Sequence, residues 1–264
     1  MRLAITAHLD YRLRSPADCL LAIEVAPMAD QVLVWDRLRV AGVGPLSPIP
    51  AQDGIGRRTW MHGETRITAD YEAMVDVNRA PAALDGLPID PLAALPADVV
   101  PYLFPSRYCD SDRFEAAVLR EFGHLAGGDK VGAIAAWIRR HLDYAPGLSS
   151  STTTASDTFV AHHGVCRDFA HLLIAMVRAA DIPARMVGAY GLGVSPQDFH
   201  AVAEVWLAGA WHLVDATGMA PTEGIVRLGV GRDATDIAFL TVFGRADFLA
   251  QSVTVTRLAD NGSI

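Results

Sequence analysis

Hydrophobic and polar side chains alternate at the start of the chain. Apolar residues stand at Leu3, Ile5, Ala7 and Leu9, with mostly polar residues between them. A period of two is typical of a strand that buries one face. Similar runs follow at residues 19–27, 31–40 and 57–77. We therefore predict that residues 1–97 form an antiparallel β-sandwich.

The pattern changes after a stretch rich in Ala, Leu and Pro, residues 81–101, which is predicted to connect two domains. Beyond it, apolar residues recur every three to four positions in runs that begin near Asp112, Asp129 and Cys166. Glu115 stands three positions after Asp112, as in a capping box.

Strand-like runs follow these helices at residues 184–192, 200–208, 211–217, 224–231, 237–243 and 252–258. Helices followed by strands favour an α+β arrangement. We therefore predict an α+β protein with two domains, residues 1–97 and residues 98–264.

Composition narrows the classes of partner. The chain has 264 residues, a formal net charge of −8 and three cysteines. A net negative charge disfavours binding to nucleic acid. No apolar run reaches the roughly 18 residues that a membrane-spanning helix requires. The charged first residues do not resemble a signal peptide, and widely spaced cysteines are typical of free thiols in a reducing compartment. We predict a cytoplasmic protein with neither nucleic acid nor membrane as partner. Export by another route and the oligomeric state stay open.

Cys166 stands in the first turn of the third predicted helix, in the stretch GVCRDFAHLL. A helix N-terminus favours negative charge and therefore stabilises a thiolate. Gly164, two residues earlier, allows another backbone or a substrate to come close. A thiolate nucleophile also requires a base and a group that orients the base.

Candidates for these two roles stand in DFHAVAEVWLAGAWHLVDAT, where His200 opens one strand and Asp215 closes the next. A two-residue turn at Ala208-Gly209 would pair residue 202 with residue 215. His200 and Asp215 would then share one face of the hairpin as diagonal neighbours. This turn places Ala208 at a positive φ, which has a conformational cost. A three-residue loop would separate the two side chains unless a bulge restored the phase.

The Cys, His and Asp segments, in this order over roughly residues 100–220, resemble the core of the transglutaminase-like superfamily. The β-rich first half and PSRYC at 105–109 are similar to bacterial transglutaminase-like cysteine peptidases with their own N-terminal domain. The resemblance implies a papain-like core, with helices packed on an antiparallel sheet. It also implies Cys166 as nucleophile, His200 as general base and acid, and Asp215 as the residue that orients His200.

These roles imply attack of the Cys166 thiolate on an amide carbonyl, with the backbone N–H of Cys166 as one oxyanion donor. A second donor upstream of the helix is typical of the family and has no assigned residue here. A protein or peptide is the expected substrate, and hydrolysis is favoured over cross-linking because water is abundant. No Gly-rich phosphate loop or acidic calcium loop is present, so we expect no cofactor and no metal.

Two other functions stay open. A non-catalytic binding protein could keep the same fold, and slow alkylation of Cys166 would favour it. An arylamine-type acyltransferase uses the same three residue types, but the sequence before the cysteine is HHGVC, without the R-G-G-x-C pattern. A turnover assay with acetyl-coenzyme A distinguishes that activity.

The remaining polar residues and cysteines have simpler interpretations. We predict core or structural roles for Cys19 and Cys109, a buried hydrogen-bonding role for His171, and helix-start or packing roles for Arg167 and Asp168. Glu204 lies on the His200 face of its strand and is interpreted as an exposed strand residue rather than a site residue. A zinc site at His162, His163 and Cys166 lacks a fourth ligand. The Ser/Thr loop at 149–154 is either an ordinary surface loop or part of the cleft.

Overall fold

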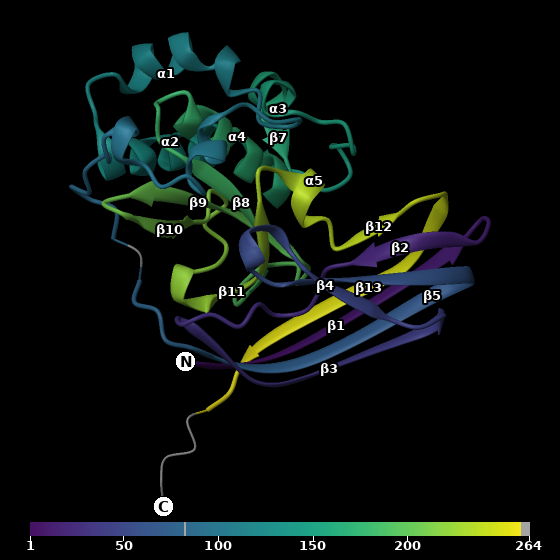
Figure 1. Cartoon of the computed structure of the whole chain (residues 1–264). Coiled ribbons are helices and arrows are strands. Elements are labelled where there is room, and N and C mark those ends of the chain that lie inside the picture. Colours follow the sequence, from purple (N-terminus) through teal and green to yellow (C-terminus); the bar gives the residue numbers. More distant parts are fainter. Residues whose placement is uncertain (82, 260–264) are drawn as a thin grey trace, which may run out of the picture.

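The structure is a computed structural model that describes residues 1–81 and 83–259. Residue 82, in the predicted connector, and residues 260–264, at the end of the predicted second domain, lie outside the described residues. Two antiparallel sheets and a group of helices make up the molecule (Figure 1). No described helix is long and apolar enough to cross a membrane.

The first sheet has seven strands and is built mainly from the first third of the chain. Its early strands are β1 (Arg2–Leu13), β2 (Ala17–Leu21), β3 (Gln31–Val43), β4 (Ser47–Pro50) and β5 (Arg57–Val77). The 21-residue β5 pairs with all four of the others. Because this one long strand joins them, they form a single sheet rather than the predicted two-layer sandwich.

Two strands from the end of the chain complete this sheet. They are β12 (Leu240–Val242) and β13 (Ala246–Arg257). β13 pairs with β1 from Leu3 with Arg257 to Leu13 with Ala246, and β12 pairs with β2. The sequence analysis assigned these residues to the second domain, whereas the structure adds them to the first sheet. The division into two domains at residue 97 stays a prediction.

The second sheet has the strand order β10-β9-β8-β11. Its strands are β8 (Ala184–Gly191), β9 (His200–Leu207), β10 (Ala210–Val214) and β11 (Ile225–Gly231). The helices are α1 (Glu115–Phe122), α2 (Gly127–His141), α3 (Ala155–Ala161), α4 (Cys166–Arg178) and α5 (Ala234–Ile237). A short parallel pair, β6 (Asp143–Tyr144) and β7 (His163–Gly164), precedes α4. The predicted α+β class, with helices packed on an antiparallel sheet, is confirmed.

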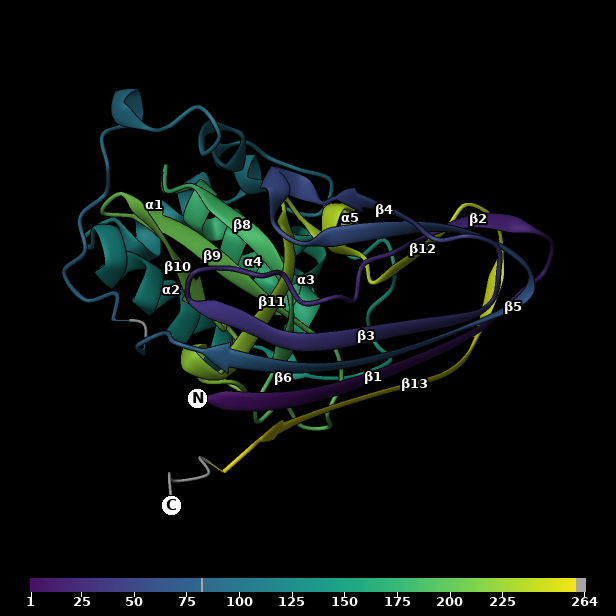
Figure 2. The ribbon, with the colours of Figure 1, turned by 60° about the horizontal axis from the view of Figure 1, so that its bottom comes forward.

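The helices cover one face of the second sheet, and the first sheet lies toward the other (Figures 1 and 2). Ala201, Ala203 and Val205 of β9 face α4 in one apolar core. Tyr190 and Val226 pack instead with the inner face of the first sheet. Helix α4 is therefore buried along almost its whole length, and only its first turn reaches the surface.

The start of two helices differs from the sequence prediction. Asp112 lies in a 3₁₀ turn before α1, and no side chain caps that helix. Helix α3 begins directly after the Ser/Thr loop at 149–154 and was not predicted from the sequence. Thr154 and Asp157 begin α3 with a capping box, because the side chain of each binds the backbone N–H of the other. This pair is the signal in the sequence that could have identified α3.

Candidate active site

Cys166 is the first residue of α4 and is partly exposed. Strand β7 ends at Gly164, directly before this point. Val165 then has an extended backbone and is the N-cap residue of α4. Asp168 is fully buried and accepts a hydrogen bond of 2.9 Å from the backbone N–H of Val165. A Cβ at Gly164 would lie 2.7 Å from the Cβ of Asp168, so this position has no room for a side chain. The predicted helix-start role of Asp168 is confirmed.

Arg167 connects the helix start to the Ser/Thr loop. Its guanidinium donates hydrogen bonds to Asp168 at 2.9 Å, to the Ser149 hydroxyl at 2.6 Å and to the Ser150 carbonyl at 2.7 Å. These bonds hold the loop beside Cys166, and Ser151 lines the adjacent cleft. Of the two interpretations of this loop, the structure supports the one in which it forms part of the cleft.

The hairpin of β9 and β10 brings His200 and Asp215 together. Ala208 and Gly209 form a two-residue turn with φ values of 51° and 77°. Ala210 pairs with Leu207, and the register continues to Val214 opposite Ala203. The Nε2 atom of His200 lies 3.0 Å from Oδ2 of Asp215. The prediction that parity places both residues on one face of the hairpin is therefore confirmed.

Four hydrogen bonds hold the Asp215 carboxylate in place. Oδ1 accepts from the backbone N–H of Thr217 at 2.9 Å and from its hydroxyl at 2.7 Å. Oδ2 accepts from the backbone N–H of Ala220 at 3.0 Å, in addition to His200. Burial by itself raises the pKa of Asp215, but these partners outweigh burial and lower the pKa below its ordinary value. The carboxylate is thus ionised and fixed against His200.

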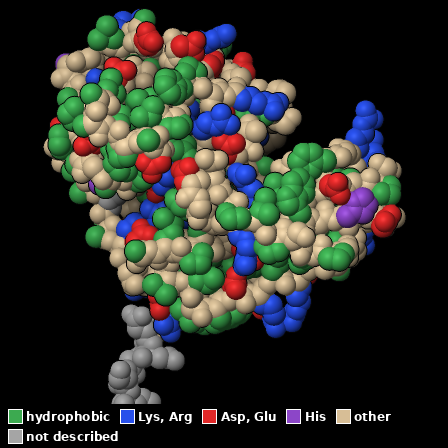
Figure 3. All heavy atoms as spheres, in the orientation of Figure 1, with side chains coloured by type: hydrophobic (Ala, Val, Ile, Leu, Met, Phe, Trp, Pro, Cys, Tyr) green, Lys and Arg blue, Asp and Glu red, His purple; other side chains and the backbone are tan. Residues whose placement is uncertain are grey.

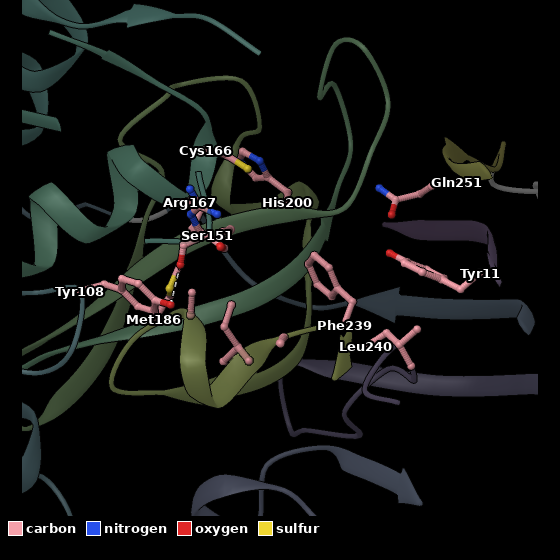
Figure 4. A pocket seen from close by; sticks show the side chains of 14 residues that line it. Tyr11, Tyr108, Ser151, Cys166, Arg167, Met186, His200, Phe239, Leu240 and Gln251 are labelled. Carbon is pink, nitrogen blue, oxygen red and sulfur yellow. Dashed lines mark hydrogen bonds between the residues drawn. The ribbon is translucent and has the colours of Figure 1, made fainter. Parts of the chain in front are cut away.

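The other ring nitrogen of His200 faces the cysteine. Figure 4 shows the sulfur of Cys166 beside the His200 ring. The Nδ1 atom is buried and has no other hydrogen-bond partner among the described residues. Burial alone lowers the pKa of His200, but the hydrogen bonds and charges of Asp215 and Cys166 raise it to about 9. His200 is therefore an imidazolium near neutral pH, which favours a negative charge on the adjacent sulfur.

Tyr144 is a neighbour of Cys166 that the sequence analysis missed. Its backbone pairs with Gly164 where β6 meets β7. Its hydroxyl lies near the backbone N–H and the sulfur of Cys166. Burial and the charge of Cys166 raise the pKa of Tyr144 to about 12, so the hydroxyl keeps its proton. The residue stands upstream of the helix, where the family resemblance indicates a second oxyanion donor.

Cys166 and His200 line a cleft of about 400 Å³ between the helical region and the first sheet. Figure 3 shows the molecule hollowed between these two parts. The cleft is lined by Tyr11, Tyr108, Ser151, Cys166, Arg167, Met186, His200, Ala201, Ala234, Ile237, Ala238, Phe239, Leu240 and Gln251. The thiol is thus accessible to a small ligand that enters from solvent.

The other two cysteines and His171 lie apart from this site. Cys19 and Cys109 are buried in separate cores, as predicted. His171 is buried, its Nε2 accepts a hydrogen bond of 3.1 Å from the N–H of Ala234, and its ring stacks on Tyr108. Burial lowers the pKa of His171 to about 4, so it is neutral at physiological pH. The predicted buried hydrogen-bonding role is confirmed.

The histidines before Cys166 do not assemble a metal site in the described part of the chain. No group of three or more His, Cys, Asp or Glu residues there is arranged to hold a metal ion. His162 ends α3 at a φ of 55°, and its ring instead contacts the carbonyl of His141 at 3.1 Å.

The interpretation of Glu204 as an exposed residue is wrong. Glu204 is fully buried, and its two oxygens accept hydrogen bonds from Arg185 at 2.8 Å and from Arg227 at 2.7 Å. Arg227 also binds Asp30, which follows the first strands of the chain, at 2.8 Å. Glu204 is therefore part of a buried ion cluster between the second sheet and the N-terminal region.

Comparisons with known proteins place the chain in a family. Residues 116–216, which include the Cys, His and Asp segments, match the family model described as "Transglutaminase-like superfamily". The Mycobacterium leprae protein ML0607 is 37% identical over 141 residues, which are 49% of this chain and 50% of that protein. The chain thus spans about half the length of this curated relative.

Two solved structures are similar to the whole chain or most of it. The structure described as a "Putative Cysteine Protease" from Cytophaga hutchinsonii is 33% identical, with a TM-score of 0.91, and the match covers 100% of this chain and 92% of that one. The periplasmic domain of TgpA from Pseudomonas aeruginosa is 17% identical, with a TM-score of 0.43, over 78% of this chain and 91% of that one. On the family model and the Cytophaga structure, the chain belongs to the transglutaminase-like superfamily.

Proposed function

We propose that this protein hydrolyses amide bonds of a peptide or protein substrate through a thioester on Cys166. The observation that carries the proposal is the hydrogen-bonded His200–Asp215 pair, with the free ring nitrogen of His200 directed to a partly exposed cysteine at a cleft. A nucleophile, a base and a group that orients the base are the parts required for thiol-dependent acyl transfer.

The first half of the reaction forms the thioester. The Cys166 thiolate attacks the amide carbonyl carbon, and the carbonyl π electrons move to oxygen. The backbone N–H of Cys166 and the hydroxyl of Tyr144 are positioned to donate to that oxyanion. The imidazolium of His200 then transfers its Nδ1 proton to the leaving nitrogen, the C–N bond breaks, and the amine departs. Asp215 stabilises the imidazolium and fixes the orientation of its ring.

The second half releases the acyl group. Neutral His200 accepts a proton from a water molecule as the water oxygen attacks the thioester carbonyl. The C–S bond breaks, the carboxylic acid leaves, and the thiolate–imidazolium pair is restored. A primary amine in place of water would give a new amide, which is the cross-linking outcome. Hydrolysis is the proposed reaction because water is present at far higher concentration than any amine.

Alkylation at controlled pH tests the proposal. Iodoacetamide at pH 6 should modify Cys166, because His200 is still protonated and favours the thiolate. Burial raises the pKa of Cys19, and it raises that of Cys109 to about 12, so neither should react. Mass spectrometry of the digested protein identifies the modified residue, with Cys19→Ala as the matched control. Equal slow modification of all three thiols would favour a binding protein instead.

Turnover of an amide substrate is the complementary measurement. Cys166→Ala should abolish release of the amine product, while far-UV circular dichroism stays that of the folded wild type. The assay is run with and without a primary amine. Incorporation of that amine into the product would show acyl transfer and contradict hydrolysis as the main reaction.

A further inference from the structure

One wall of the cleft comes from the first sheet rather than from the helical region that carries Cys166. Tyr11 of β1, Leu240 of β12 and Gln251 of β13 lie across the cleft from Tyr108 and Ser151 (Figure 4). Two of these strands, β12 and β13, come from the end of the chain and reach this position only because they pair with β2 and β1. A peptide that fills the cleft would therefore also contact the first sheet.

The lining residues offer an apolar surface to the side chains of a substrate. Met186, Ile237, Phe239 and Leu240 contribute aliphatic and aromatic groups, and the polar groups that the first sheet adds, from Tyr11 and Gln251, are neutral. Phe248 is 60% exposed and packs edge-on against Tyr11, with ring centroids 5.6 Å apart. The apolar surface thus continues out of the cleft along β13.

No lining residue described here offers a free charge outside the Cys166–His200 pair. The guanidinium of Arg167 is bound to Asp168 and to the Ser149–Ser150 loop. Asp198 borders the wall as a carboxylate that is exposed to solvent, and its Oδ1 accepts hydrogen bonds from the Gln251 amide and the Phe199 N–H. An acidic side chain that entered the cleft would lose water without gaining a free cation among the lining residues. A basic side chain would meet only the solvent-exposed carboxylate of Asp198 near the wall, and an exposed ion pair contributes little.

We propose that the cleft selects amide substrates with uncharged, apolar side chains next to the scissile bond, and that the first sheet contributes to this selectivity through Leu240. This inference rests on the proposed function of Cys166. A large aliphatic or aromatic side chain buries its surface against Leu240, Phe239 and Met186, whereas Asp or Lys at the same position is desolvated. The N-terminal region is then part of substrate recognition.

Three peptidyl chloromethyl ketones that differ only in the residue next to the reactive carbon, Leu, Asp or Lys, test this selectivity. The second-order rate of Cys166 alkylation is measured for each and divided by the iodoacetamide rate of the same protein. Iodoacetamide has no side chain, so its rate reports the reactivity of the thiol. The ratio therefore reports only how the cleft recognises the side chain of each reagent. The Leu reagent should react at least about 10-fold faster than either charged reagent.

A charge introduced on the first-sheet wall sharpens the test. Leu240→Arg should raise the normalised rate of the Asp reagent and lower that of the Leu reagent, changing their ratio at least about 10-fold. Leu119→Arg, at an exposed position of α1, is the matched control and should leave the ratio as in the wild type. The comparison of the three reagents on the wild type stands even if Leu240→Arg does not fold.

The possible failures are distinguishable. Equal normalised rates for the three reagents, together with fast iodoacetamide labelling at pH 6, would overturn the selectivity and leave the proposed function intact. A faster Lys reagent would also overturn it and would point to Asp198 as the recognition group. If Cys166 does not react with iodoacetamide at pH 6, the proposed function fails and the inference fails with it.

Discussion

Two positions on strand β9, its first residue His200 and the more central Glu204, contrast two kinds of buried polar group. His200 and Glu204 lie on the same face of the strand, and both are fully buried. Glu204 has both oxygens bound by arginines, so its hydrogen-bonding capacity is filled. His200 has one ring nitrogen bound by Asp215, and the other is directed to Cys166.

This difference teaches which buried polar groups are candidates for chemistry. A buried group that is completely paired is locked in one state, and removal of a partner leaves an uncompensated charge. A buried group that has one hydrogen-bonding atom directed at a reacting atom can transfer a proton to or from that atom. The two residues share one face of the strand and are equally buried. Only the partners distinguish a structural carboxylate from a proposed catalytic histidine.

The largest expected effect is at His200. His200→Ala should lower amide turnover about 1,000- to 10,000-fold, because it removes the imidazole that accepts and returns the proton. Steady-state kinetics measures the loss. His212→Ala on the adjacent strand is the matched control, since the His212 ring makes a hydrogen bond to the Leu207 carbonyl and lies outside the His200–Asp215 pair. Comparable losses in both variants would mean that the hairpin, and not the imidazole of His200, had been damaged.

Glu204 should respond in stability rather than in chemistry. Glu204→Gln leaves Arg185 and Arg227 without their shared counter-charge and should lower the free energy of unfolding by about 3–5 kcal/mol. Urea denaturation measures the change. Glu72→Gln removes an exposed partner of Arg37 and should cost less than about 1 kcal/mol. An equally small effect for Glu204→Gln would remove the contrast between the two residues.

A pH-dependent stability should distinguish His200 from Glu204. The pKa of His200 is raised from 6.5 to about 9, so its stabilising contribution is complete below about pH 6.5 and is lost as pH rises through 9. The free energy of unfolding should fall by about 1–3 kcal/mol more in the wild type than in His200→Asn between pH 6 and pH 9.5. Parallel pH profiles for the two proteins would show that the imidazolium does not stabilise the fold.

The smallest expected effect concerns the turn that brings the two hairpin strands into phase. Ala208 has a φ of 51°, a conformation that glycine adopts without strain. Ala208→Gly should therefore raise the free energy of unfolding by about 0.5–1 kcal/mol. Gly209→Ala should lower it, since residue 209 has a φ of 77°. Thermal unfolding checks both signs, and destabilisation by Ala208→Gly would contradict the turn geometry.

The sequence by itself determined the local elements of the site. The alternation along the hairpin and the two-residue turn placed His200 and Asp215 on one face, since side-chain direction in a strand follows from parity. The apolar run after Cys166 located a buried helix with the cysteine at its start. Both conclusions depend on residues within about 20 positions of one another.

Only the tertiary structure decided the partners that come from far along the chain. Leu3 pairs with Arg257, Glu204 is neutralised by Arg227, and Tyr11 forms a wall opposite Cys166. Nothing in the local pattern distinguishes an exposed strand glutamate from one that two arginines hold, because burial of a charge depends on whether counter-charges arrive from other strands. For the same reason, the pattern marked β12 and β13 as strands without indicating their sheet, since the edge available to them was formed by residues more than 200 positions earlier.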